Sequence, residues 1–120
     1  MKNISKYAIG LSAALIVGCA SVPAPTERIA ISKVAIENAV SAGGSEFAPA
    51  EMKSARDKLA RANVAMGQND YANAKWLAEQ AQVDADLAAS MSRTAQAQKA
   101  ALAVREDGRV LQEELDRKSK

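Results

Sequence analysis

The sequence lacks several residue types on which common active sites depend. Among its 120 residues there is no histidine and only one cysteine, Cys19, and aromatic residues make up 3%. Zinc sites built from Cys and His are therefore excluded, as are Ser–His and Cys–His nucleophile pairs. So few aromatic rings also argue against a carbohydrate-binding cleft. These absences predict a protein that is not an enzyme and that holds no metal or dissociable cofactor.

Long hydrophobic runs are missing as well. The most apolar stretch, "YAIGLSAALIVG" at residues 7–18, has about a dozen residues, whereas a membrane-spanning helix needs about 20. It follows a short basic start that contains Lys2 and Lys6, and small residues lie close to its end. This combination is typical of a secretory signal peptide, which is removed from the mature protein. We therefore predict residues 1–18 as a signal peptide and leave them out of the fold.

The end of that run, Ile16-Val17-Gly18-Cys19, resembles the lipobox of bacterial lipoproteins. In that family the cysteine sulfur receives a diacylglyceryl group, the signal is cut before the cysteine, and the new amine is acylated. One acyl chain binds a membrane only marginally, but several chains hold a protein stably. The resemblance implies that Cys19 is the lipidation site. Ala20, in place of the aspartate that retains such proteins in the inner membrane, implies the periplasmic face of the outer membrane.

The charge balance of the chain does not favour binding of nucleic acid. The whole chain has 16 basic and 14 acidic residues, and removal of Lys2 and Lys6 with the signal peptide leaves 14 of each. Binding of nucleic acid requires a basic patch or stripe, and the mature chain shows neither. We therefore expect no nucleic-acid partner.

Prolines and glycines divide the mature chain into segments. Pro23 and Pro25 predict a short stiff tether at residues 19–25, between the lipid and the folded part. The stretch "SAGGSEFAP" predicts a loop, and Pro49 suits the first turn of the next helix. The expected folded unit is therefore a helical domain over residues 26–104.

The first segment, residues 26–41, is expected to be a helix. Ile29, Ile36 and Val40 fall on one helical face, although isoleucine and valine at these positions would also suit a strand. We favour a helix because the rest of the chain has clear helical periodicity.

The next two segments predict an alanine-rich antiparallel hairpin with a long second helix. Residues 49–66 carry a helical stripe of apolar side chains: Met52, Ala55, Leu59, Ala62 and Met66. Residues 70–104, which Asn69 or Asp70 can cap, carry a narrow stripe of small ones: Ala74, Ala78, Ala81, Ala85 and Ala88. Because alanine lets two backbones approach closely, we expect these two stripes to face each other.

A second stripe on the long helix, formed by Trp76, Val83 and Leu87, lies nearly opposite the alanine stripe. Two outcomes are open for these three side chains. Segment 26–41 can cover them and give a small three-helix arrangement, or they remain exposed as the docking site of a binding partner.

Residues 105–120 form a charged extension, which is either helical or a tail. Its apolar residues and those just before it are sparse, namely Ala95, Leu102, Val110, Leu111 and Leu115. Gly108 is expected to weaken or interrupt the helix, because glycine costs about 1 kcal/mol relative to alanine in a helix interior.

The stretch Ala48–Ser90 resembles the domain of unknown function 4398. The matching features are Ala48-Pro49-x-x-Met52, the run that begins at Ala55-Arg56, Asp70-Tyr71-x-x-Ala74 and "LAEQAQVDADLA" at residues 77–88. Members of this family are helical envelope proteins, often lipoproteins, with no established catalytic residues. The resemblance therefore implies a helical fold and an envelope location but no activity.

Two further likenesses keep other functions open. Gly67, Tyr71, Ala74 and Ala81 follow the order of half a tetratricopeptide repeat, a helical hairpin that binds peptides when repeated. Lys118 and Lys120 invite comparison with the major murein lipoprotein, whose terminal lysine is linked to peptidoglycan.

We expect a lipid-anchored periplasmic protein of the outer membrane with a structural or protein-binding role in the cell envelope. Its partners are then the membrane and another envelope protein or peptidoglycan. The alternative is a self-associating coiled-coil spacer or peptidoglycan tether that resembles the murein lipoprotein.

Overall fold

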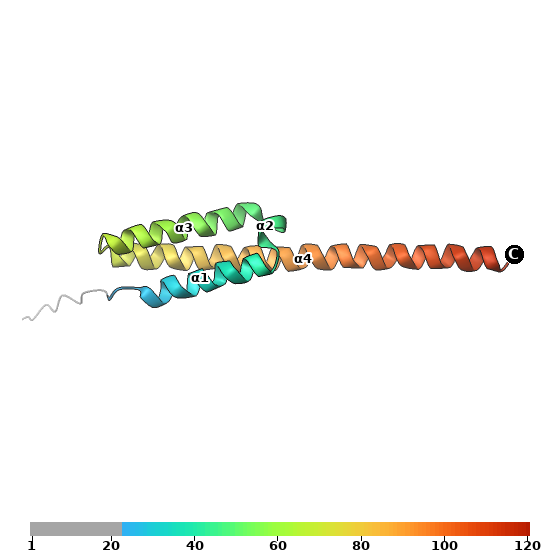
Figure 1. Cartoon of the computed structure of the whole chain (residues 1–120), viewed down its shortest axis with the longest axis horizontal. Coiled ribbons are helices and arrows are strands. Elements are labelled where there is room, and N and C mark those ends of the chain that lie inside the picture. Colours follow the sequence, from blue (N-terminus) through green and yellow to red (C-terminus); the bar gives the residue numbers. More distant parts are fainter. Residues whose placement is uncertain (1–22) are drawn as a thin grey trace, which may run out of the picture.

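A computed structural model describes residues 23–120, which form an all-α structure (Figure 1). Its helices are α1 (Thr26–Ser41), α2 (Gly44–Phe47), α3 (Pro49–Gly67) and α4 (Tyr71–Lys118), and no strand occurs in this range. The predicted fold class is confirmed. Both the predicted signal peptide and Cys19 lie outside the described residues. Within the described range, no helix combines the length and the apolar character that crossing a membrane requires.

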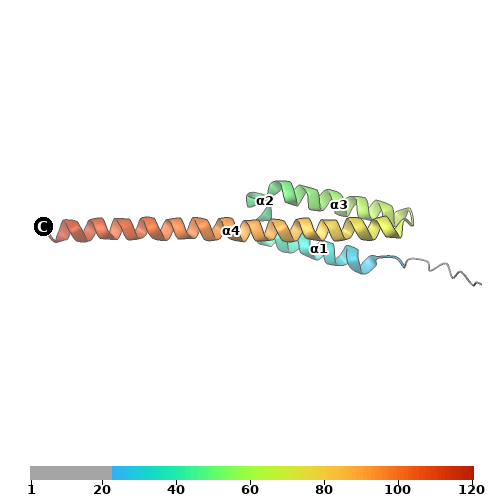
Figure 2. The ribbon, with the colours of Figure 1, turned by 180° about the vertical axis from the view of Figure 1, so that it is seen from behind.

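Helices α3 and α4 form the predicted antiparallel hairpin, which Figures 1 and 2 show from opposite sides. Helix α3 begins at Pro49, where the missing N–H removes no helical hydrogen bond. Before α4, Asp70 acts as the cap, because its carboxylate accepts a hydrogen bond from the Asn73 amide at 3.3 Å. The chain reverses through Asn69, whose φ of 60° lies in the left-handed region that asparagine tolerates.

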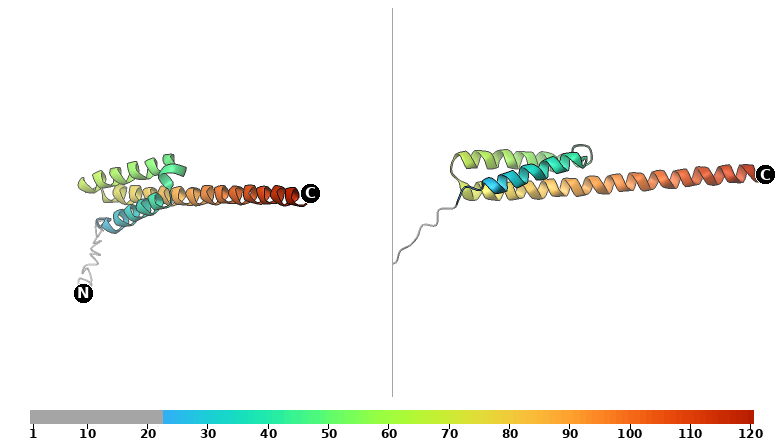
Figure 3. Two further views of the ribbon diagram at one scale, coloured as in Figure 1. Left: turned by 45° about the vertical axis from the view of Figure 1, so that its right-hand side comes forward. Right: turned by 60° about the horizontal axis from the view of Figure 1, so that its bottom comes forward.

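Helix α1 lies beside the hairpin, runs parallel to α4, and contacts both α3 and α4 (Figure 3). Its buried residues are Ser32, Ala35, Ile36 and Ala39. The helical interpretation of residues 26–41 is confirmed, but the predicted face was partly wrong. Val40 is 44% exposed, because the small side chains at positions 32, 35 and 39 allow a closer approach than a valine face would.

The tether is shorter than residues 19–25. Pro25 is buried, and its carbonyl oxygen accepts a hydrogen bond from the Ile29 amide at 3.1 Å. This proline is the residue directly before α1 and belongs to the folded part. Only the chain before Pro25 can therefore act as a spacer.

The connection between α1 and α3, predicted as a loop, contains the single helical turn α2. Gly43 starts this turn with a φ of 85°, a conformation that glycine adopts without steric cost. The side-chain amide of Gln96 on α4 donates a hydrogen bond to the carbonyl oxygen of Ala42 at 2.9 Å. The connection is thus fixed against the middle of α4.

The core consists mainly of alanine, as the narrow stripe predicts. On α4 the buried residues are Ala74, Leu77, Ala78, Ala81, Ala85, Ala88, Ala89 and Ser92. On α3 they are Met52, Ala55, Ala62 and Ala65. Met52 and Leu77 are the largest side chains that are almost fully buried. Leu59 and Met66 of the predicted stripe are only partly buried, because Ala65 takes the innermost place at the end of α3.

Helix α4 continues to Lys118, so the predicted end at residue 104 was too early. Its 48 residues correspond to about 72 Å of helix. Gly108 does not interrupt it, and a Cβ atom at that position would have no neighbour within 4 Å. Residues 105–118 therefore continue the helix and are not an irregular tail, and Figure 1 shows this end standing away from the other helices.

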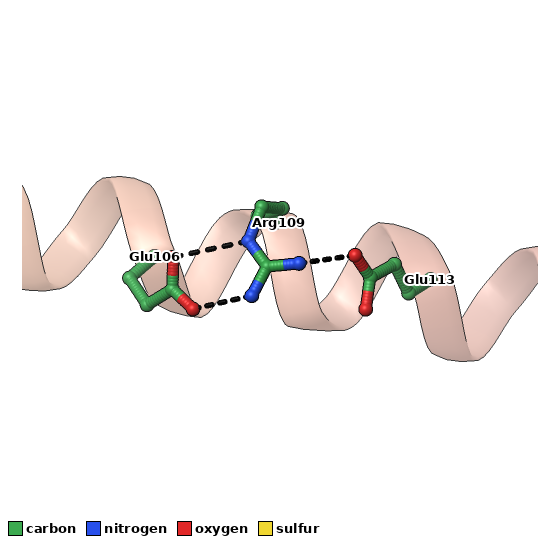
Figure 4. A network of polar contacts seen from close by, with 3 residues as sticks. All are labelled: Glu106, Arg109 and Glu113. Atoms are coloured by element: carbon green, nitrogen blue, oxygen red, sulfur yellow. Dashed lines mark hydrogen bonds and ion pairs between the residues drawn. The ribbon is translucent and has the colours of Figure 1, made fainter.

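Arg109 links two carboxylates across the weak point at Gly108 (Figure 4). Its Nε atom donates a hydrogen bond to Glu106 at 3.0 Å, and its Nη1 atom donates one to Glu113. The hydrogen bond from Arg109 holds the pKa of Glu106 below its ordinary value. These contacts join residues on both sides of the glycine and favour a continuous helix there.

Candidate docking surface

The second predicted stripe of α4 faces solvent. Trp76 is 56% exposed, Val83 is 60% exposed and Leu87 is 48% exposed. Met91, one turn further on, is also exposed. These four side chains lie on one side of α4, the side that turns away from the bundle core, with Gln80 between Trp76 and Val83. We call Trp76, Val83, Leu87 and Met91 the outer stripe.

Helix α1 does not cover the outer stripe, so that part of the first outcome was wrong, although the small three-helix arrangement itself is confirmed. The alanine face of α4 accommodates both α1 and α3, because its side chains are small enough for two helices to lie close together. Arg28 of α1 approaches Glu79 of α4 at 3.8 Å, while Ile29 packs near the buried Leu77. The three helices thus share one core, and the opposite face of α4 has no partner within residues 23–120.

Beyond the bundle, α4 presents further apolar side chains to solvent. Leu102, Val104, Val110, Leu111 and Leu115 are all between 45% and 69% exposed. From Gln96 to Lys120 every residue is exposed except Glu114. An isolated helix of this length gains little stability from its own hydrogen bonds, and most helical stability in proteins comes from packing. The free half of α4 is therefore a surface that packing against a further helix would stabilise.

The sequence analysis missed Val104, which at 69% is the most exposed of the large apolar side chains. It lies seven residues before Leu111 and eleven before Leu115, so these three share one helical face. That spacing was the available signal. Composition alone does not reveal it, because small and polar residues separate the apolar side chains of the free half.

A polar cluster braces α3 against α4 beside the outer stripe. Asp84 of α4 accepts hydrogen bonds from Lys58 Nζ and Ser54 Oγ, both at 2.6 Å. Burial acts to raise the pKa of Asp84, but these hydrogen bonds and the charge of Lys58 outweigh it and hold the pKa below its ordinary value. The neighbouring Asp86 is exposed and points elsewhere, as helical spacing predicts, and residues 23–120 contain no cluster of metal-ligating side chains.

The lowered pKa of Asp84 predicts an acid-sensitive contribution to stability. This contribution is complete above the pKa of the unfolded chain and is lost as the pH falls through the lower pKa of the folded protein. Asp84→Asn should therefore destabilise a fragment covering residues 23–120 near neutral pH and flatten the acid limb of its stability. Urea unfolding, followed by circular dichroism between neutral pH and about pH 2.5, measures both effects.

Asp57→Asn is the matched control for this experiment. It removes the ion pair between Lys53 and Asp57, which measures 2.5 Å and has side chains 78% and 60% exposed. Exposed pairs of this kind contribute little to stability. The idea of a brace at Asp84 fails if both variants change the acid limb equally.

Comparison with known proteins identifies the family but no function. A family model described as a domain of unknown function, DUF4398, matches residues 27–104. The match extends over α1, α2, α3 and α4 as far as Val104, and thus reaches well beyond the stretch at residues 48–90 that carries the resemblance in sequence. No curated protein and no solved structure matches the chain. The chain, whose greater part this model covers, belongs to the DUF4398 family.

Proposed function

We propose that this protein is a lipoprotein of the outer membrane that projects a helical docking surface into the periplasm. In this proposal Cys19 carries the lipid. The bundle of α1, α3 and α4 holds the long helix α4 in place, and the outer face of α4 binds a protein partner. The role is structural and not catalytic.

The exposed apolar face of α4 is the observation that supports a docking role. Large apolar side chains on a soluble surface favour association when they form a continuous patch, because burial of each removes apolar area from water. Here they line one helix over several turns, at Trp76, Val83, Leu87 and again at Val104, Leu111 and Leu115. A neighbouring helix is the partner that fits such a narrow, straight strip.

The sequence before the bundle supports the anchoring part. Ile16-Val17-Gly18-Cys19 follows a basic start and a short apolar run. Helix α1 starts at Thr26, only a few residues after Cys19, and the beginning of α4 lies at the same end of the bundle (Figure 1). A lipid on Cys19 would therefore hold the bundle near the membrane and direct the free half of α4 away from it.

Cys19→Ser should abolish lipid attachment. In cells supplied with labelled palmitate, the wild-type protein is expected to carry the label and the Cys19→Ser variant to carry none. The reason is that cysteine sulfur and the amine of the same residue are the acyl acceptors in the lipobox family.

Ala20→Asp is a suitable control, because it leaves the acceptor in place. This variant is expected to keep the label and to move from the outer-membrane fraction to the inner-membrane fraction. Label retained on the Cys19→Ser protein would disprove the anchor, and an unchanged fraction for Ala20→Asp would disprove the predicted sorting.

A spacer or peptidoglycan tether is the second candidate. The observation in its favour is the continuous α4, whose 48 residues form a rod of about 72 Å with Lys118 near its free end. Such a rod reaches away from the membrane whether or not it binds another envelope protein. Purified peptidoglycan sacculi that retain the protein after boiling in detergent would support a covalent tether, and complete release would exclude it.

A further inference from the structure

The outer face of α4 follows one heptad register from the bundle to the free end. Starting at Trp76, steps of four and three residues alternate without a break and define a single seam: Trp76, Gln80, Val83, Leu87, Ser90, Thr94, Ala97, Ala101, Val104, Gly108, Leu111, Leu115 and Lys118. Most of these positions are apolar. They include Val104, which does not stand out from the composition of the free half alone. Apolar residues that recur at this period over several heptads are the pattern of a coiled coil, and here polar residues or glycine interrupt it at five positions: Gln80, Ser90, Thr94, Gly108 and Lys118.

The seam lies on the side of α4 that the bundle leaves free. In the same register, the buried residues of α4 fall mainly in two rows on the opposite side, Ala74–Ala81–Ala88 and Ala78–Ala85–Ser92. A second helix can therefore lie along the seam without displacing α1 or α3. In a straight helix a seven-residue repeat drifts by about 20° per heptad, and a left-handed supercoil would bring the whole seam onto one side.

We propose that α4 pairs along this seam with α4 of a second copy of the chain, in parallel and in register. This inference names the occupant of the docking surface and rests on the docking role proposed for α4. The pair would be a two-stranded coiled coil that begins beside the bundle at Trp76 and ends near Lys118.

The polar positions of the seam favour an identical helix as the partner. Buried polar groups need hydrogen-bond partners, and a mismatch against an apolar side chain leaves them unsatisfied. In a parallel, in-register pair, Gln80, Ser90 and Thr94 each meet their own counterpart and can bond to it. A polar residue at such a position is also a known means of fixing register. A second copy, moreover, has a seam of the same length and period.

The match of polar positions, more than the charge balance, distinguishes the parallel pair from the antiparallel one. Full antiparallel overlap would place Glu79 beside Glu114 and Asp86 beside Asp107 as like charges, and Asp84 beside Arg105 as opposite charges. It would also set Gln80 against Leu111. In the parallel pair most flanking positions combine a charged residue with a neutral one, such as Asp107 with Gln112. Only Glu79 and Asp84 meet as like charges, and Asp84 is already hydrogen-bonded to Lys58 at 2.6 Å.

Disulfide cross-linking of the full-length protein in its membranes tests the pairing. Leu111→Cys introduces a thiol on the seam, at a side chain that is 64% exposed. Leu102→Cys is the matched control, because Leu102 is 62% exposed and lies off the seam. After mild oxidation and non-reducing electrophoresis, we expect most of the Leu111→Cys chain as dimer and most of the Leu102→Cys chain as monomer. Equal dimer yields, or none from either variant, would overturn the parallel pair.

A second variant separates pairing along the seam from collision within the membrane. With Ser90→Cys as the cross-linking reporter, an added Leu111→Asp places a charge in the seam and should abolish most of the dimer. An added Leu102→Asp should leave it unchanged. An unchanged yield with Leu111→Asp would show that the free half takes no part and would overturn the proposal.

The wild-type chain in the same experiment tests the lipid anchor separately from the pairing of α4. The wild-type chain, whose only cysteine is Cys19, should give no disulfide dimer if that residue is acylated. A wild-type dimer would therefore contradict the anchor, whatever the seam variants show. Monomers from every seam variant, with the wild type still lipidated, would overturn self-pairing and leave the docking surface for a different protein.

Discussion

Met52→Ala is expected to lower the free energy of unfolding by about 2–5 kcal/mol, the usual cost of a large-to-small substitution in a packed core. Met52 is only 1% exposed and is among the largest almost fully buried side chains. It packs in the cluster where α1, α3 and α4 meet, with Ala39, Ala55 and Ala85 among its members. Alanine-rich surroundings cannot extend to fill the space, so most of the cavity should persist.

The comparison is with Met91→Ala, which truncates the same side chain on the outer stripe, where it is 39% exposed. That variant should unfold at nearly the wild-type urea concentration. Both measurements need the same protein concentration, because association of the chains would add to the apparent stability. Equal losses in the two variants would mean that the three helices do not close around Met52.

The helices of the bundle could be predicted because each is encoded locally. Pro49 and Asp70 mark the two helix starts of the hairpin, and both act as expected. The alanine stripe has the period of a helix face and is buried as predicted. Helix starts and helix faces depend only on residues within a few turns, so they can be predicted without knowledge of the tertiary arrangement.

The position of α1 could not be predicted, because it depends on how much surface the alanine face offers. The sequence shows two apolar stripes on α4, and pairing each with one helix is the simplest arrangement. The structure instead places α1 and α3 on the same face. Ser32, Ala35 and Ala39 make this arrangement possible, since small side chains on α1 meet small side chains on α4. Helix patterns show which faces are apolar but not which face takes which partner.

The connection to α3 shows a second limit. In sequence, two adjacent glycines indicate a loop. In the structure a Cβ atom at Gly44 would lie 2.7 Å from the carbonyl oxygen of Ala39 and 2.9 Å from Met52 Sδ. Gly44 is thus required by close tertiary packing, a reason that local sequence cannot reveal.

The exposed apolar face of α4 was predicted in its first half only. Trp76, Val83 and Leu87 stand out because large side chains interrupt a run of alanines. The continuation through Val104, Leu111 and Leu115 is separated from them by small and polar residues, so composition hides it. Only the fixed period of seven connects the two halves, and that period becomes meaningful once α4 is known to be one uninterrupted helix.

Ala81→Leu tests the close approach on which this arrangement depends. Ala81 is fully buried on the alanine face of α4, and a leucine there would add three carbon atoms where the neighbouring helices leave no space. Overpacking of this kind typically costs about 1–3 kcal/mol, so the urea midpoint of the fragment covering residues 23–120 should fall clearly. Ala103→Leu is the control, because Ala103 is exposed on the free half of α4 and leucine is nearly as good a helix former as alanine. The control should unfold like the wild type. If Ala81→Leu does so as well, α1 and α3 cannot both lie close against that face, and the outer stripe would lose its status as the uncovered side of α4.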